Sequence, residues 1–149
     1  MKYKILLVEN PKAGKSNTEN YIREIEYNLK KLNYEIVIKY TTIENNATDI
    51  IKKYDDDYDT LIVCGGDGTL NEAIQGICEI DKKVFIGFIP MGTANDFAKS
   101  LNTSFDKLHL SKNINNYEAK KIDIGVFSKR IFNNGCKKRY VLFCKQEQY

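Results

Sequence analysis

Four consecutive apolar residues, Leu61-Ile62-Val63-Cys64, lead directly into the turn Gly65-Gly66-Asp67-Gly68-Thr69. An unbroken apolar run is expected for a parallel strand that is buried on both faces of a sheet. Glycines at the end of such a strand let the chain reverse sharply, and residues 70–77 then have a helical pattern. This strand–turn–helix unit predicts a parallel sheet covered by helices, which is an α/β fold.

The chain on either side of this unit continues the same alternation of strand and helix. Its order, βαβαβαβ, predicts a doubly wound, Rossmann-like parallel sheet. Residues 127–149 could hold one or two more strands, but the last of them have no clear pattern. Besides residues 61–64 and 70–77, we predict strands at residues 3–8, 34–40, 84–89 and 119–126, and helices from residue 18, at 47–53 and at 94–101.

Composition limits the class of protein. The chain has 149 residues, 42% hydrophobic and 29% charged, as in a soluble globular domain. No apolar stretch approaches the ~20 residues that span a bilayer, and residues 1–8 do not resemble an export signal. The four cysteines show no metal-ligand spacing, so we predict free thiols and a cytoplasmic location. The net charge of +3 is compatible with contact at an anionic membrane surface but does not require it.

The glycine turn has the chemistry of a phosphate site. Glycines let backbone N–H groups approach an anion closely. We expect Thr69 to cap the following helix, whose N-terminus carries a partial positive charge. Asp67 could bind Mg²⁺ or orient a phosphoryl acceptor. A turn without a ligand would need one glycine, whereas this turn has three, so a phosphate site is the favoured interpretation.

Two further segments fall at the ends of predicted strands. Ligands of parallel sheets bind beyond the carboxyl ends of the strands, and residues 10–14 and 90–96 lie there together with the glycine turn. In the second segment, Thr93 and Asn95 offer a hydroxyl and an amide to phosphate or ribose. In the first, Gly14-Lys15-Ser16 matches the end of a P-loop, but Glu9 stands where its opening glycine belongs. A carboxylate there would repel phosphate, so we decide against a P-loop.

The three segments together resemble the diacylglycerol kinase catalytic domain, and the bacterial lipid kinases are the most similar group. The resemblance is carried by Asn10-Pro11-x-x-Gly14, by Gly65-Gly66-Asp67-Gly68-Thr69-Leu70-Asn71-Glu72, and by Pro90-x-Gly92-Thr93-Ala94-Asn95-Asp96-Phe97-Ala98. Ile122-Asp123-Ile124-Gly125 resembles the strand that enters the family's second domain. NAD kinases and phosphofructokinases share a related glycine–aspartate turn, but residues 92–98 favour the lipid kinases.

The resemblance implies an enzyme that moves the γ-phosphoryl group of Mg-ATP onto the hydroxyl of a lipid such as diacylglycerol. It implies that Asp67 positions phosphate or Mg²⁺, and it assigns no set of metal ligands. No nucleic-acid partner is expected. The residues implied to contact ATP are Asn10, Pro11, Lys12, Ala13, Gly14, Thr41 (or its neighbour Thr42), Gly65, Gly66, Asp67, Gly68, Thr69, Leu70, Asn71 and Thr93.

The resemblance covers about residues 2–134, so it also implies a division of the chain. We expect residues 1–125 to form the nucleotide-binding domain and residues 126–149 to begin a truncated second domain or to form a divergent tail. In the family, a β-rich second domain supplies the general base and further metal ligands. We therefore expect this chain to be a nucleotide-binding half that is inactive alone. The alternatives are a non-catalytic nucleotide-binding module and an NAD kinase-like enzyme.

An isolated half would expose apolar surface that its partner domain normally covers. We therefore expect the chain to self-associate, for example as a homo-oligomer. The candidate residues for this surface are Phe127, Ile131, Phe132, Val141, Leu142 and Phe143.

Overall fold

The structure, a computed structural model, describes residues 3–14, 18–54, 58–100, 118–122 and 140–144. The strands are β1 (Lys4–Glu9), β2 (Glu35–Tyr40), β3 (Thr60–Gly65), β4 (Phe85–Pro90), β5 (Glu118–Ile122) and β6 (Tyr140–Cys144). The helices are α1 (Thr18–Lys31), α2 (Ala47–Lys53), α3 (Asp67–Ile80) and α4 (Asp96–Ser100).

The strands form one sheet in the order β2-β1-β3-β4-β6-β5. The pairs β1–β2, β1–β3, β3–β4 and β4–β6 are parallel, and β5 is antiparallel to β6. The chain runs from β1 outward to β2 and then crosses back past β1 to β3. The strand order therefore reverses between β1 and β3, which is the place where doubly wound sheets bind ligands.

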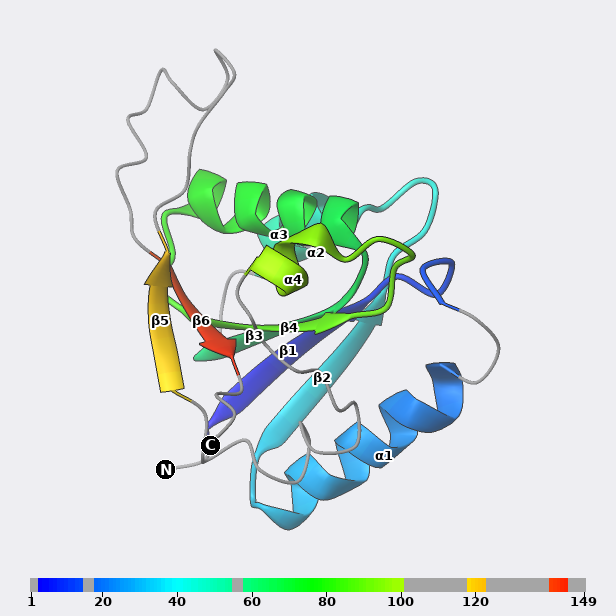
Figure 1. Cartoon of the computed structure of the whole chain (residues 1–149). Helices are drawn as coiled ribbons and strands as arrows, with labels where there is room; N and C mark the ends of the chain where they lie inside the picture. Colours follow the sequence, from blue (N-terminus) through cyan, green and yellow to red (C-terminus); the bar gives the residue numbers. More distant parts are fainter. Residues whose placement is uncertain (1–2, 15–17, 55–57, 101–117, 123–139, 145–149) are drawn as a thin grey trace.

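Helices cover both faces of this sheet, as the doubly wound prediction requires. Figure 1 shows α1 on one side and α2, α3 and α4 on the other. Side chains of β1 alternate between the two cores: Leu6 and Val8 pack toward α2 and α3, while Ile5 and Leu7 pack toward α1. Every residue of β3 is buried, which confirms the prediction of a central strand covered on both faces.

Most predicted elements agree with the structure within a few residues, and α2 has the predicted bounds. Two helices begin elsewhere than predicted. α3 begins at Asp67, three residues early, so the second half of the glycine turn is its first turn. α4 begins at Asp96, two residues late, because Asn95 has a left-handed backbone with φ of 50° that a helix cannot include.

The C-terminal part is described only in two strands. β5 matches the predicted strand at 119–126 as far as Ile122, and residues 123–126 lie outside the described residues. β6 is one of the strands expected in 127–149, and it pairs within the same sheet. Of the apolar residues expected to be exposed, Phe127, Ile131 and Phe132 lie outside the described residues. The division at residue 125 and the exposure of 141–143 stay predictions.

Candidate functional site

The glycine turn and the two other strand-end segments meet at the carboxyl edge of the sheet. The backbone N–H of Asn10 donates to the carbonyl of Cys64 at 2.9 Å, and the N–H of Met91 donates to the carbonyl of Gly65 at 2.8 Å. These bonds extend the ladders of β1, β3 and β4 into the segments that follow. On the other side of β1, the N–H of Thr41 donates to the carbonyl of Glu9 at 2.8 Å. Residues from four separate segments of the chain are thereby brought together at this edge of the sheet.

The N-terminus of α3 lies in the middle of this cluster. Its N-cap is Gly66, which has an extended backbone and makes no side-chain cap hydrogen bond. The prediction that Thr69 caps the helix is wrong: Thr69 lies inside the first turn and is 5% exposed. Its hydroxyl accepts a hydrogen bond from the Asn10 side-chain amide at 3.1 Å. Thr69 thus ties the first segment to the glycine turn and leaves the helix end without a side-chain cap.

Close packing explains some of the glycines in the cluster but not all of them. A Cβ on Gly65 would lie 2.7 Å from the Thr69 hydroxyl oxygen, and a Cβ on Gly92 would lie 2.8 Å from the Gly66 Cα. Both glycines are therefore needed for close packing. A Cβ on Gly68 would meet nothing within 4 Å among the described residues. Since glycine within a helix costs about 0.5–1 kcal/mol relative to alanine, packing alone gives no reason for Gly68.

The Asp67 carboxylate accepts hydrogen bonds from the chain that follows β4. Its two oxygens accept hydrogen bonds from the backbone N–H groups of Asp96 at 2.9 Å and Phe97 at 3.3 Å. Asp67 therefore caps the N-terminus of α4 from outside the helix and joins it to the glycine turn. This contact could not be read from the sequence, because the residues are 29 and 30 positions apart. The role of Asp67 toward phosphate or Mg²⁺ stays a prediction.

Within residues 90–96, the Asn95 side chain forms two hydrogen bonds to the backbone of Gly92. The Asn95 side-chain oxygen accepts from the Gly92 N–H at 2.9 Å, and its amide donates to the Gly92 carbonyl at 2.8 Å. The amide that the sequence offered to a ligand is thus used within the turn. Thr93, between them, is exposed and remains a candidate ligand contact. Phe97 packs against the core with its ring 6.2 Å from that of Phe88.

The first segment is a tight turn built on Asn10. The Asn10 side-chain oxygen accepts from the Lys12 N–H at 3.0 Å, and its carbonyl accepts from the Ala13 N–H at 3.1 Å. A Cβ on Gly14 would collide with the methyl group of Thr18, so packing requires this glycine. Pro11 and Lys12 are exposed at the edge of the cluster, while Lys15 and Ser16 lie outside the described residues.

Glu9 is a buried carboxyl group directly beneath this turn. Its side chain is 2% exposed, and its Oε2 atom has no hydrogen-bond partner among the described residues. Burial raises the pKa of Glu9, and the nearby charge of Glu19 raises it further. A side-chain hydrogen bond with Thr18 acts in the opposite direction. The sequence marked Glu9 as a residue unsuited to a P-loop but did not indicate that it is buried.

The cluster suits phosphate better than a metal held by protein alone. In the described ranges, no three acidic, histidine or cysteine side chains are grouped as metal ligands. Any Mg²⁺ at Asp67 would need further ligands from phosphate oxygens and water. A cavity of about 330 Å³ lies at the opposite edge of the sheet, lined by residues that include Lys4, Glu35 and Lys53. It contains none of the three segments and is not the site described here.

Comparison with known proteins identifies the family. Residues 4–127 match the family described as the diacylglycerol kinase catalytic domain. The chain is 37% identical over 135 residues to a diacylglycerol kinase of Staphylococcus carnosus, which is 90% of this chain and 44% of that protein. It is 35% identical over 129 residues to a diacylglycerol kinase of Staphylococcus haemolyticus, which is 86% of this chain and 39% of that protein.

Solved structures agree with this match. The crystal structure of a diacylglycerol kinase from Bacillus anthracis superposes with a TM-score of 0.70 at 30% identity. The superposition covers 80% of this chain and 44% of that chain. The chain thus spans less than half the length of these relatives. The doubly wound fold is the one that the sequence predicted, and the chain belongs to the diacylglycerol kinase catalytic domain family.

Proposed function

We propose that this chain is the nucleotide-binding part of an ATP-dependent lipid kinase. The observation that carries the proposal is the bare N-terminus of α3 at the point where the strand order reverses. Unpaired N–H groups at a helix N-terminus form a favourable site for phosphate. The open space beside Gly68 lets a phosphate group approach the backbone closely. Family membership supports ATP as the phosphate compound and a lipid hydroxyl as the acceptor.

In the proposed reaction, the γ-phosphoryl group of ATP moves to the hydroxyl of a lipid such as diacylglycerol. When bound, Mg²⁺ supplies part of the neutralisation of phosphate charge that such transfers need. The chain's own residues bind and orient the nucleotide. Backbone N–H groups at Gly68 and Thr69 hold phosphate oxygens, and Asp67 orients the phosphate end. Thr93, which is exposed, and Thr41, at the end of β2, lie at the same edge of the sheet and offer hydroxyl groups to the nucleotide.

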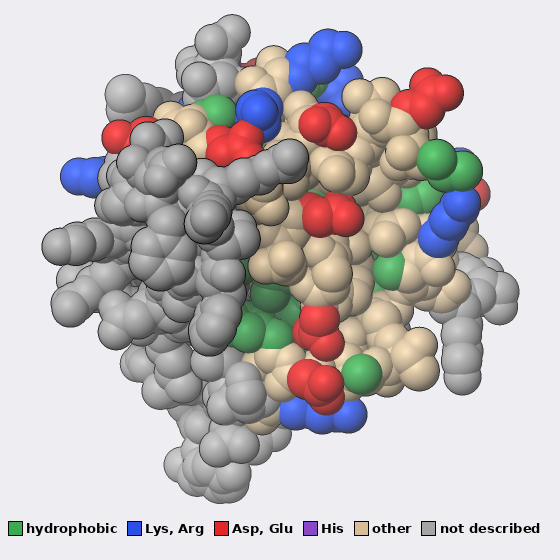
Figure 2. Space-filling model, turned by 90° about the horizontal axis from the view of Figure 1, so that it is seen from above, with side chains coloured by type: hydrophobic (Ala, Val, Ile, Leu, Met, Phe, Trp, Pro, Cys, Tyr) green, Lys and Arg blue, Asp and Glu red, His purple; other side chains and the backbone are tan. Residues whose placement is uncertain are grey.

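The acceptor lipid would bring the enzyme to a membrane surface. No helix in the described ranges combines the length and apolar character that crossing a bilayer requires. Figure 2 views the face covered by α2, α3 and α4, where acidic side chains lie near the centre and basic side chains lie toward the margins. Because anionic headgroups attract Lys and Arg, we do not expect the described part of this face to meet an anionic membrane.

Binding of ATP by the chain as it stands tests the proposal most directly. We expect calorimetry to detect ATP binding in the presence of Mg²⁺. Gly66→Val and Asp67→Ala should each weaken this binding at least about tenfold. The valine side chain would block close approach of phosphate to the backbone, and the alanine would remove the cap of α4. Tyr27→Ala on α1, at a side chain that is 59% exposed and on the other face of the sheet from α3, serves as the control. Unchanged binding in both site variants would place the nucleotide elsewhere.

A phosphoryl-transfer assay with radiolabelled ATP and diacylglycerol micelles separates the remaining possibilities. Transfer would show a complete kinase, whereas binding without transfer would support a nucleotide-binding module that needs further chain. Transfer to a soluble hydroxyl compound but not to lipid would contradict the lipid acceptor. The absence of any ATP binding would overturn the proposal as a whole.

A further inference from the structure

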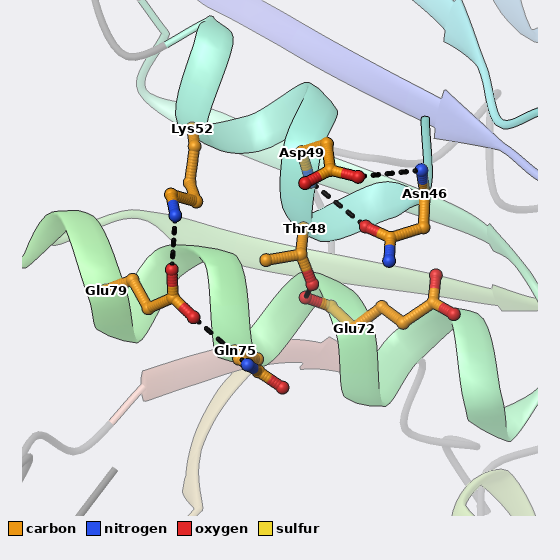
Figure 3. A network of polar contacts seen from close by, with 7 residues as sticks. All are labelled: Asn46, Thr48, Asp49, Lys52, Glu72, Gln75 and Glu79. Atoms are coloured by element: carbon orange, nitrogen blue, oxygen red, sulfur yellow. Dashed lines mark hydrogen bonds and ion pairs between the residues drawn. The ribbon is translucent and has the colours of Figure 1, made fainter. Parts of the chain in front are cut away.

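Glu72 lies one turn into α3, just beyond the glycine turn, and it contacts α2. Its Oε2 atom accepts a hydrogen bond from the backbone N–H of Ala47 at 3.2 Å. Its backbone carbonyl accepts from the Thr48 hydroxyl at 2.7 Å, as Figure 3 shows. A Cβ on Gly76, one turn further, would lie 3.1 Å from the Ile51 Cβ. The two helices are therefore closely packed where Glu72 reaches across.

Ala47 is the first residue of α2, so Glu72 places a carboxylate at the N-terminus of a neighbouring helix. The same helix end has its own capping box, in which Asn46 and Asp49 bond each other's backbone N–H groups. Figure 3 shows the capping box of Asn46 and Asp49, with Glu72 nearby on α3. The capping box satisfies the N–H groups of Asn46 and Asp49, and Glu72 satisfies the N–H of Ala47 between them. Negative charge near a helix N-terminus is favourable in addition to the hydrogen bond.

The segment 41–46, which precedes this helix end, is held at both of its ends. At its start, the Thr41 N–H donates to the Glu9 carbonyl at the end of β1. Within it, Thr42 and Asn45 close a small turn: the Thr42 N–H donates to the Asn45 carbonyl, and the Asn45 N–H donates to the Thr42 hydroxyl. At its end, the chain passes into Ala47 and the Glu72 carboxylate. Thr41 and α3 are thus connected through a short segment, by way of Ala47 and Glu72.

We propose that Glu72 is a positioning residue that fixes segment 41–46, and with it Thr41, at the edge of the proposed nucleotide site. The proposal rests on the proposed function, because it assumes that Thr41 borders ATP. Three side chains near the start of α3 then hold three neighbouring segments: Thr69 holds the segment of Asn10, Asp67 holds α4, and Glu72 holds α2. Of these three, only Glu72 acts without lying in the glycine turn itself.

The test compares ATP affinity and the hydrogen exchange of the Ala47 amide in the 149-residue chain. We expect Glu72→Ala to speed exchange at Ala47 and to weaken ATP binding about fivefold. We expect Glu72→Gln to restore affinity to within about twofold, because its amide oxygen can accept the same hydrogen bond. The control is Glu79→Ala. It removes the ion pair with Lys52 (2.7 Å), which joins the same two helices further along α3 from the glycine turn. It should leave ATP affinity unchanged.

A second variant removes the same hydrogen bond from its other side. Ala47→Pro lacks the N–H donor, proline is favoured at the first position of a helix, and Asn46 has the extended backbone that precedes proline. We expect it to weaken ATP binding about as much as Glu72→Ala, and the double variant to be no weaker than either, because both delete one bond. Thermal unfolding of each variant identifies those that are folded, and the folded ones decide the outcome.

Each result separates this inference from the proposed function. If the unmodified chain binds ATP and the folded variants Glu72→Ala or Ala47→Pro bind it equally tightly, the positioning role is wrong while the nucleotide site stands. If Glu79→Ala weakens binding as much as Glu72→Ala, the effect comes from general helix packing and the positioning role is also wrong. If the unmodified chain does not bind ATP, the proposed function fails and the role of Glu72 fails with it.

Discussion

The N-termini of α2 and α3 lie on the same side of the sheet and are built in opposite ways. At the N-terminus of α2, side chains of Asn46, Asp49 and Glu72 all accept backbone hydrogen bonds. The N-cap of α3 is a glycine and makes no side-chain cap hydrogen bond. A helix end that only needs stability is capped, because each cap contributes about 1 kcal/mol. A helix end left bare at the ligand edge of a sheet is available to an external anion.

The largest effect on ATP affinity should come from placing a carboxylate at the N-terminus of α3, as is already the case at the N-terminus of α2. Gly68→Asp puts a carboxylate on the first turn of α3, where a new side chain meets no described atom within 4 Å. We expect the free energy of unfolding to rise by about 0.5–1 kcal/mol, from the helix dipole and the loss of a glycine. ATP affinity should fall on the order of 100-fold, because two negative groups would share the site. Urea denaturation and calorimetry measure the two quantities on the same sample.

Gly68→Ala is the matched control for that variant, since it removes the glycine without adding charge. It should raise stability by about 0.5 kcal/mol and weaken ATP binding far less than the aspartate does. If Gly68→Asp binds ATP as well as Gly68→Ala does, the bare helix end is not the phosphate site. The comparison of the two helix ends would then concern stability alone.

The opposite change, removal of a cap from α2, should affect stability more than binding. Asn46→Ala deletes the side chain that accepts the Asp49 N–H at 3.0 Å. We expect the free energy of unfolding to fall by about 1 kcal/mol. ATP affinity should fall no more than about twofold, because the bond from Ala47 to Glu72 remains. A larger loss of affinity than in Glu72→Ala would mean that the capping box, rather than Glu72, holds segment 41–46.

Much of this architecture could be predicted from the sequence, because it depends on local patterns. The apolar run of β3, the helical spacing of α1 and the glycine punctuation each reflect a local physical requirement, and their order determines a doubly wound sheet. The three strand-end segments could be placed together for the same reason, since carboxyl ends of parallel strands share one edge. The capping box of Asn46 and Asp49 also has a sequence spacing that could have been recognised.

The contacts that assemble the site could not be predicted in this way. Asp67 reaches residues 29 and 30 positions away, Glu72 reaches Ala47 over 25 positions, and Asn10 reaches Thr69 over 59 positions. Such contacts depend on how helices dock on the sheet, and no spacing along the chain encodes them. Residue types suggested ligand contacts for Asp67, Asn95 and Thr69, which stay predictions, but did not suggest the bonds that each of them makes to the protein itself.

The smallest effect is expected at a third helix N-terminus, that of α1, where the buried Glu9 carboxyl lies beside Thr18. Burial raises the pKa of Glu9 from its ordinary value of 4.5, and the charge of Glu19 adds to the rise. A carboxyl group whose pKa is raised by folding stabilises the fold fully below its unfolded pKa, and that contribution is lost as pH rises through the folded pKa. Ionised Glu9 therefore opposes folding toward neutral and alkaline pH.

Glu9→Gln removes this titration while keeping the shape of the side chain. We expect the variant to gain stability relative to the unmodified chain as pH rises through the unfolded pKa of 4.5, with little difference well below that pH, where Glu9 is protonated in both states. Urea denaturation at several pH values measures this difference, and Glu35→Gln at the exposed start of β2 is the control. A difference that shrinks as pH rises would mean that Glu9 is stabilised in its ionised form by a bound cation or a partner. Glu9 would then belong to the polar edge of the site rather than to the core beneath it.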